Sequence, residues 1–297
     1  MLAIRIDDLE KVYAQGLMRR AVKAVAGVSL EVAEGEAFGF VGPNGAGKSS
    51  TIRIMMGLAR PTRGSCRLFG IDAALPLARK QVGYVPENPC LYDYLTPLEI
   101  LTMSVNLHCH KERRETRHHV MRWLDRLGVA HVASVPIRSF SKGMTQRVAL
   151  ANAMAVEPRL LILDEPLSGL DPIGRSEVVE ILAEYKREGG TLFFTSHVLH
   201  DVERLADRFG LIHKGELRSV RSPAELVGED ERVMVRYAGK VGLEGATEEA
   251  LGRWVTEVPR SQLWAYLGAV HANGHELIEV RPTLSLEAAF MRVISVN

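Results

Sequence analysis

The stretch GFVGPNGAGKSS constrains the fold more than any other part of this 297-residue chain. It follows the strand-like run EAFGFVG and opens a helical pattern, which is the context in which G-x-x-x-x-G-K-[ST] forms a phosphate-binding loop. Gly42, Gly45 and Gly47 let backbone N–H groups surround phosphates, and Lys48 reaches the β- and γ-phosphates as a point charge. Ser49 can offer its hydroxyl to Mg²⁺. The alternative, a glycine-rich turn without a ligand, leaves the lysine and both serines unexplained.

Two carboxylates and a histidine follow apolar runs further along the chain. In RLLILDEP, Asp164 and Glu165 come directly after the run LLIL, and in FFTSHV, His197 ends another run. In a P-loop fold the first carboxylate holds Mg²⁺ through its water shell, and the second polarises the attacking water as a general base. His197 terminates a strand as the P-loop does, which favours a contact with the γ-phosphate. The competing interpretations are a structural acidic turn and a structural histidine.

A third motif, SFSKGMTQR, precedes the helical run TQRVALANAMAV. Ser141 is a good N-cap, because its side-chain oxygen can accept from free backbone N–H groups of the first turn. Gly143 allows close approach to the backbone. A helix N-terminus of this kind attracts an anion.

The order of the elements predicts an α/β fold. Residues 2–41 read as short strands with turns, and the strands further on alternate with helices, which favours a parallel sheet covered on both sides. Apolar residues at helical spacing from about 96 to 157 predict an inserted helical subdomain. The composition shifts past Gly215, and strand-like RVMVRYAG and HELIEVRP flank a helix that ends at Gly274. We therefore expect a separate small α/β unit at 219–297.

Composition excludes several classes of protein. The formal net charge of +1 lacks the basic excess of a nucleic-acid-binding domain. No apolar run approaches the ~18 residues that span a bilayer. The N-terminus is acidic and alternating, so we expect no signal peptide. Three cysteines without C-x-x-C spacing cannot all pair, which fits a reducing cytosol.

The motifs together resemble the nucleotide-binding subunit of an ABC (ATP-binding cassette) transporter, over about residues 5–215. In the family's order, KVY offers an aromatic for adenine, GPNGAGKS is Walker A and YVPE falls at the Q-loop. FSKGM falls at the LSGGQ signature, LLILDEP is Walker B, SGLD is the D-loop and TSH holds the switch histidine. The six ordered motifs from Walker A to the switch histidine are far more specific than a P-loop alone.

The resemblance implies a fold, a reaction and a set of residues. It implies a P-loop NTPase ABC-type nucleotide-binding domain at 1–218, with the helical subdomain at about 96–157 and a C-terminal α/β accessory domain at 219–297. It implies ATP and Mg²⁺ as cofactors. The residues expected to bind the nucleotide are Tyr13, Gly42, Pro43, Asn44, Gly45, Ala46, Gly47, Lys48, Ser49 and Ser50, with Ser141 and Gly143 of the facing subunit. The expected metal ligands are Ser49, Glu87 and Asp164, and the expected catalytic residues are Glu165, His197 and Lys48.

The resemblance also implies partners and a location. Two chains, identical or merely similar, would sandwich two ATP molecules head to tail, so that the signature of one faces the P-loop of the other. A separate transmembrane permease would convert closure into substrate movement, with the chain on the cytoplasmic face of the membrane and no nucleic acid involved. Tyr92 and Tyr94, just after the Q-loop, are candidates for the groove that receives the permease. Cargo contacts would lie in the permease, so the sequence does not name the cargo.

Two motifs depart from the family pattern. Glu87 stands where the family usually has glutamine, which adds a negative charge near the γ-phosphate. The signature reads Ser141-Lys142-Gly143-Met144, with lysine and methionine at its second and last positions. SKGM and YxPE together resemble an exporter-type branch with a separate membrane subunit. That branch often carries a C-terminal extension with a motif like SLEAAF.

Competing functions leave different marks in a sequence. ABC ATPases that act on ribosomes usually hold two cassettes, whereas this chain has one P-loop. DNA-repair members separate Walker A from the signature by long coiled coils, and nucleotide kinases and small GTPases lack the signature and the switch histidine. The histidine-rich stretch LHCHKERRETRHH invites a metal site. However, His108 and His110 are two residues apart, and His118 and His119 are adjacent, so a solvated helical face is the better interpretation.

Overall fold

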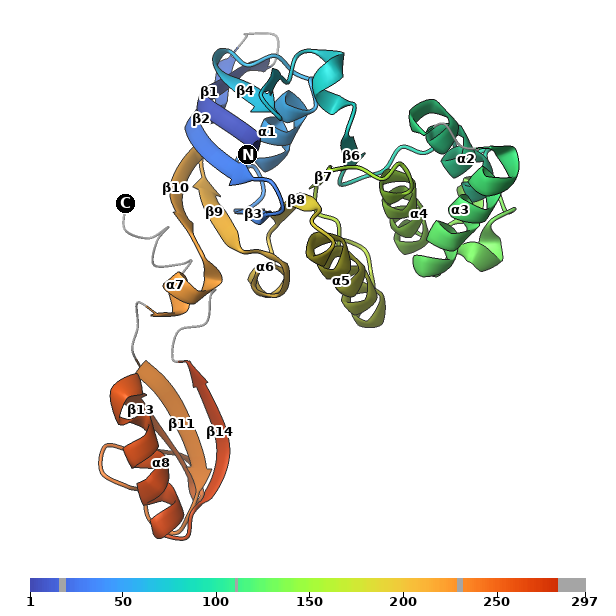
Figure 1. Ribbon diagram of the computed structural model, residues 1–297. Helices are drawn as coiled ribbons and strands as arrows, with labels where there is room; N and C mark the ends of the chain where they lie inside the picture. Colours follow the sequence, from blue (N-terminus) through green and yellow to red (C-terminus); the bar gives the residue numbers. More distant parts are fainter. Residues whose placement is uncertain (16–19, 110–111, 229–231, 283–297) are drawn as a thin grey trace. The chain divides into compact units, whose positions relative to one another are not determined.

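The computed structural model describes residues 1–15, 20–109, 112–228 and 232–282. It divides the chain into two compact units, Met1–Val220 and Arg221–Asn297 (Figure 1). Each unit is built around its own buried cluster of apolar side chains. The SLEAAF stretch at 285–290 lies outside the described residues.

A six-stranded sheet forms the centre of the first unit. Its order is β10-β9-β3-β8-β7-β6. The strands are β3 (Ala37–Val41), β6 (Val82–Val85), β7 (Leu160–Leu163), β8 (Thr191–Ser196), β9 (Arg208–His213) and β10 (Glu216–Arg221). The strands from β9 to β6 pair in parallel, as the alternation of strands and helices predicts. Every residue of β3, β7 and β8 is buried, which explains their continuous apolar runs.

A second, antiparallel sheet covers one face of the first. Its order is β2-β1-β4-β5, from β1 (Leu2–Gln15), β2 (Arg20–Ala33), β4 (Arg63–Leu68) and β5 (Ile71–Asp72). The prediction of short strands here was wrong, because β1 and β2 are 14 residues each and form one long hairpin. Several register shifts interrupt their pairing, and these irregularities break the strict alternation by which a long strand is recognised.

The core lies between the two sheets and encloses the first helix, α1 (Lys48–Met55). Phe38 stacks on Phe193 across neighbouring strands with ring centroids 5.9 Å apart. Ile52 and Met55 are completely buried against them. This packing holds the start of α1 directly after the end of β3. The opposite face of β3 meets α6 (Leu199–Leu205), since a side chain added at Gly39 would touch Val202.

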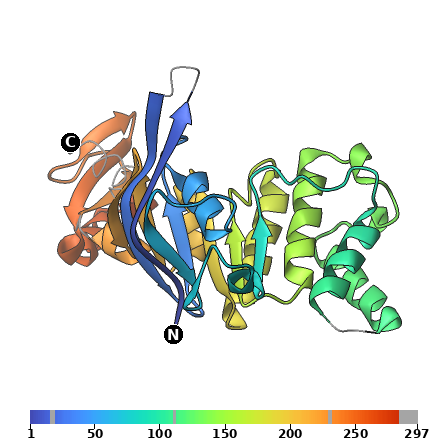
Figure 2. The ribbon, with the colours of Figure 1, turned by 90° about the horizontal axis from the view of Figure 1, so that it is seen from above.

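The helical subdomain lies beyond the edge strand β6, as Figure 1 and Figure 2 show. It contains α2 (Pro97–His108), α3 (Arg113–Arg126) and α4 (Lys142–Ala155), with short 3-10 turns at Ala130–Val132 and Ile137–Ser139. A capping box between Thr96 and Glu99 fixes the start of α2. These hydrogen bonds to Thr96 lower the pKa of the Glu99 carboxyl.

One predicted feature of the subdomain was wrong. His119, assigned from the sequence to a solvated face, is 4% exposed. Its Nε2 lies 2.8 Å from the carbonyl oxygen of Ala155, and Arg122 lies 3.1 Å from its Nδ1. This histidine joins α3 to the end of α4. In the part of the chain that the structure describes, no group of three or more His, Cys, Asp or Glu could hold a metal ion.

The second unit is a small antiparallel sheet with one helix packed on it. Its elements are α7 (Pro223–Gly228), β11 (Arg232–Ala238), β12 (Thr247–Ala250), β13 (Arg253–Pro259), α8 (Leu263–Ala272) and β14 (Glu276–Pro282), with a 3-10 turn at Arg260–Gln262. The sheet order is β12-β13-β11-β14. Val235, Tyr237, Val258 and Val270 form its core. Among the described residues of both units, no helix is long and apolar enough to cross a membrane.

Candidate functional site

The glycine loop between β3 and α1 accepts no side chain at two of its positions. A Cβ on Gly42 would lie 2.2 Å from the carbonyl oxygen of Ile212. Gly47 has φ of 112°, and a Cβ there would lie 2.5 Å from the carbonyl oxygen of Ala24. The glycines therefore bring the loop backbone against β9 and β2. Among the described residues, no side chain caps the N-terminus of α1, so its first N–H groups are available to an anion.

The ammonium of Lys48, which directly follows this loop, is held by oxygen atoms of Gly42 and Glu165. The Lys48 side chain is 6% exposed. The Nζ donates to the carbonyl oxygen of Gly42 at 2.6 Å and lies 3.2 Å from Oε1 of Glu165. The ammonium thus joins the P-loop to the carboxylate that follows β7.

One hydroxyl contacts both acidic residues that follow β7. Thr195 of β8 donates from Oγ1 to Oδ1 of Asp164 at 2.7 Å and accepts from the backbone N–H of Glu165 at 2.9 Å. Glu165 has φ of 51°, in the left-handed region that costs a residue with a side chain about 1–2 kcal/mol. This bond to Thr195 holds the strained turn that presents Glu165. Sequence reasoning missed Thr195 as a site residue; its place before Ser196 and His197 at a strand end was the available signal.

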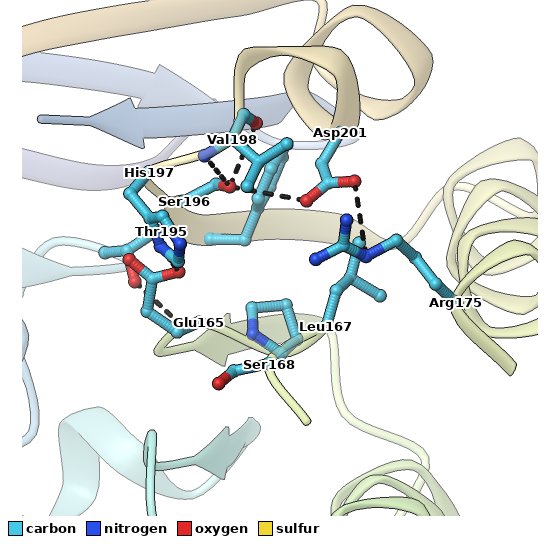
Figure 3. Close-up of a pocket in the computed structure, with 11 residues that line it drawn as sticks. Glu165, Leu167, Ser168, Arg175, Thr195, Ser196, His197, Val198 and Asp201 are labelled. Carbon is cyan, nitrogen blue, oxygen red and sulfur yellow. Dashed lines mark hydrogen bonds and ion pairs between the residues drawn. The ribbon is translucent and has the colours of Figure 1, made fainter. Parts of the chain in front are cut away.

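The side chain of His197 faces that of Glu165. Its Nδ1 lies 2.8 Å from Oε2 of Glu165, and the two side chains point toward each other (Figure 3). The loop that carries His197 is fixed by Ser196, whose Oγ accepts from the backbone N–H of Val198 at 2.9 Å. Asp201 lies 3.5 Å from the same Oγ, and burial raises the pKa of its carboxyl while Arg175 opposes the rise.

A cavity of about 410 Å³ brings most of the predicted site together. The predicted residues that line it are Tyr13, Pro43, Asn44, Gly45, Ala46, Gly47, Lys48, Ser49, Ser50, Glu87, Glu165 and His197. Ala24 and Ser168, which the sequence did not single out, also line it. Gly42 and Asp164 are not among the described residues that line it. Gly42 accepts a hydrogen bond from Lys48, and Asp164 accepts one from Thr195.

The residues that line the cavity offer two kinds of chemistry. Tyr13 of β1 supplies an aromatic ring, with the Nζ of Lys11 4.9 Å from the ring centroid. Ser49, in the first turn of α1, and Glu87 supply oxygen atoms to the cavity. A flat base can stack on the ring, and phosphates can bind the loop, so the cavity suits a nucleoside triphosphate.

The signature segment forms a helix start, as predicted. Ser141 is the N-cap of α4, and its Oγ accepts from the backbone N–H of Met144 at 3.3 Å. Ser141 and Gly143 are not among the described residues that line the cavity. The phosphate-binding loop and the signature therefore do not share one cavity within a single chain.

Comparisons with known proteins agree with this geometry. A sequence model of the family described as "ABC transporter" matches residues 25–168. An uncharacterized ABC transporter ATP-binding protein of Synechocystis is 37% identical over 98% of this chain and 79% of its own length. The bacitracin transport ATP-binding protein of Bacillus licheniformis is 35% identical over 72% of this chain and 68% of its own. A solved structure titled as the ATP-binding subunit of an ABC transporter has a TM-score of 0.68 and 30% identity, over 76% of this chain and 92% of that one.

Proposed function

The chain belongs to the ABC transporter ATP-binding proteins, and from this premise we propose that two such chains close head to tail around two ATP molecules. The chain binds and hydrolyses ATP, and it works with a separate membrane permease to power transport. Relatives named for bacitracin and lantibiotic transport do not favour the alternative of a ribosome-acting ATPase. The SKGM and YxPE residues, which resemble an exporter-type branch, support export as the direction.

One observation carries the head-to-tail arrangement. The cavity holds the P-loop, Glu165 and His197, while the signature residues Ser141 and Gly143 lie outside it. A second chain that presents its α4 N-terminus to the cavity would add anion-binding N–H groups at the γ-phosphate. Each ATP would then be bound by both chains, and neither chain alone would complete a site.

Within each site we assign separate tasks to the residues around the phosphates. The backbone of 42–49 and Lys48 bind the β- and γ-phosphates, and Tyr13 stacks on adenine. Glu165 takes a proton from the attacking water as a general base. His197 contacts the γ-phosphate and orients Glu165, which it meets at 2.8 Å. ATP binding requires Lys48 to exchange the carboxylate of Glu165 for phosphate oxygens, which releases Glu165 toward the water.

The site suits Mg²⁺ as the second cofactor. Ser49, Glu87 and Asp164 are the oxygen donors we assign to it, and oxygen ligands are what Mg²⁺ prefers. Few carboxylates are needed, because Mg²⁺ usually keeps several waters and binds substrate phosphates. When bound, the ion neutralises charge that develops on the phosphates. Thr195 fixes Asp164 for this role.

The permease contact is assigned to the segment after Glu87. Tyr92 and Tyr94 are 57% and 66% exposed, and their ring centroids lie 5.9 Å apart. Exposed aromatic pairs are typical of interface anchors. Binding there would place the chain at the cytoplasmic face of the membrane. The unit from about 219 onward is an accessory domain in this proposal.

Complementation between two inactive chains tests the proposal. Ser141→Asp keeps a good N-cap but sets a negative charge against the phosphate that the signature binds. It avoids Gly143, where an added Cβ would press on Gly169 of the same chain at 3.1 Å. A Lys48→Ala chain mixed with a Ser141→Asp chain rebuilds one intact site per mixed dimer, so ATPase activity should return on mixing.

Two outcomes would contradict the arrangement. The mixture could stay as inactive as its components, although each component still folds and the Ser141→Asp chain still binds ATP. Alternatively, Ser141→Asp could abolish ATP binding by the monomer, which would place the signature in its own chain's site. Purification of the full chain with a membrane-spanning partner tests the transport role separately.

A further inference from the structure

The first turn of α4 grips the loop that carries Glu165 in the same chain. Lys142 donates from Nζ to Oγ of Ser168 at 3.3 Å, and Gln146 donates from Nε2 to the carbonyl oxygen of Pro166 at 3.0 Å. Residues four apart lie on one face of a helix, so both side chains reach the loop from the same side. Gln146 is completely buried, whereas Lys142 is exposed.

The contact is close as well as polar. Gly169 has φ of 79°, and a Cβ built there would lie 2.9–3.1 Å from three carbons of the Lys142 side chain. The stem of Lys142 therefore lies along the backbone of the loop. A glycine at position 142, as in the family's LSGGQ pattern, could make neither the packing contact nor the hydrogen bond.

Ser168 connects this contact to the reaction. Its backbone N–H donates to the carbonyl oxygen of Glu165 at 3.1 Å, which closes the turn on which Glu165 sits. Ser168 also lines the nucleotide cavity together with Glu165 and Lys48. Figure 3 shows Glu165 and Ser168 on the same short loop. A displacement of Ser168 would therefore also displace Glu165.

We propose that Lys142 is a positioning residue for hydrolysis, which holds the loop of Glu165 in its own chain through Ser168. The proposal rests on the assignment of Glu165 as the general base. In the head-to-tail dimer, Ser141 and Gly143 face the partner's nucleotide, while Lys142 of the same turn holds the chain's own base. The signature would then connect the two nucleotide sites through one helix turn.

A substitution that keeps the stem and removes the ammonium tests the bond. Lys142→Met should lower kcat about tenfold, the size expected for loss of one hydrogen bond with a charged donor at an exposed position, and leave the KM for MgATP unchanged. Lys142→Arg should restore most of kcat. Lys80→Met, at an exposed position outside the site, is the matched control. An unchanged kcat in Lys142→Met overturns the proposal.

A double-mutant cycle tests the route through Ser168. If Lys142 acts through that hydroxyl, Lys142→Met combined with Ser168→Ala should cost no more in kcat than the larger single change. Two losses that multiply would show independent roles and overturn the route. Circular dichroism and melting of each variant separate these outcomes from failure to fold.

Mixed dimers identify the chain in which Lys142 acts. The pair of Lys48→Ala and Ser141→Asp chains has one working site, whose Glu165 belongs to the Ser141→Asp chain. Lys142→Met should lower activity when added to that chain and have no effect when added to the Lys48→Ala chain. The opposite result would assign Lys142 to the partner's γ-phosphate and overturn the proposal. An inactive parent pair would instead count against the head-to-tail dimer, so the two failures are distinguishable.

Discussion

Replacement of Glu165 by glutamine isolates the charge of one buried carboxylate. Glu165 is 8% exposed and lies between Lys48 at 3.2 Å and His197 at 2.8 Å. Glutamine has nearly the same shape and keeps one acceptor oxygen. It cannot take a proton from water. The change therefore separates general-base chemistry from the binding of the phosphates, which depends on the loop and Lys48.

Two magnitudes follow from these contacts. General-base assistance contributes about 10²–10⁴-fold, so kcat should fall by that factor while MgATP still binds. Without nucleotide, Lys48 keeps the carbonyl of Gly42 at 2.6 Å but loses its charged partner. A weakened charge-assisted bond costs about 1–2 kcal/mol, which lowers Tm by about 2–8 °C for a domain of this size. Bound ATP supplies new anionic partners to Lys48, so the Tm difference from the parent should shrink with MgATP.

Phosphate release, thermal melting and gel filtration measure the three effects on the same protein. Glu180→Gln makes the same chemical change at an exposed position of α5 (Pro172–Arg187) and should match the parent throughout. The Glu165→Gln chain should also accumulate as a dimer with MgATP, because it binds but does not hydrolyse. Hydrolysis within about threefold of the parent, set against the range for a general base, would remove Glu165 from that role. An unchanged Tm without nucleotide would refute the ion-pair argument alone.

Three further predictions concern the cavity and one cysteine. Glu87→Gln should weaken MgATP binding, and calorimetry should show that the loss of affinity depends on Mg²⁺ concentration. An affinity that is tighter, or equal within ~0.5 kcal/mol, would mean that Glu87 is not a needed metal ligand. Gly47→Ala should abolish nucleotide binding, because its Cβ would meet a carbonyl oxygen of β2 at 2.5 Å, whereas Gly45→Ala, with nothing within 4 Å, should lose less. Burial raises the pKa of Cys66 to about 12, so at about pH 9, where ordinary thiols are largely ionised, iodoacetamide should label exposed Cys90 and spare Cys66 until the chain unfolds. Equal labelling of both thiols in the folded protein would contradict the protection of Cys66. Because the folded-state pKa of Cys66 is raised, its contribution to the free energy of unfolding should be complete below the ordinary thiol pKa and fall as pH rises toward 12.

The sequence predicted the parts of the fold that depend on local pattern. The P-loop, the Asp164–Glu165 pair and His197 each follow an apolar run, and parallel strands bring such run ends to one edge of a sheet. The same reasoning failed where pattern is weak. Strand β12 reads TEEA and is exposed at every residue, so no apolar residue marks it. The strands of the β1–β2 hairpin were predicted too short because their register shifts break the alternation.

Tertiary contacts set the limit for the site residues. Thr195 contacts the carboxylate of Asp164 and the backbone of Glu165 from a neighbouring strand, and Ser168 lines the cavity from the loop after Glu165. Neither residue type carries a signal of its own. His119 looked like a surface histidine because its neighbours in the sequence are charged. The structure instead buries its side chain and sets its ring nitrogen against the carbonyl oxygen of Ala155 on another helix. Such roles depend on partners that are distant in sequence, and one sequence does not show which partners meet.

Two residues that depart from the family pattern, Glu87 and Lys142, have opposite charges and lie at or next to one cavity. Glu87 lines it directly, and Lys142 donates to Ser168, which lines it as well. Relative to a glutamine and a glycine, the pair leaves the net charge around the cavity unchanged. The extra carboxylate of Glu87 is therefore accompanied by the extra ammonium of Lys142, which is hydrogen-bonded to a residue that lines the cavity. The sequence reveals both charges, but they are 55 positions apart in the chain, and only the fold shows that they lie close to the same cavity.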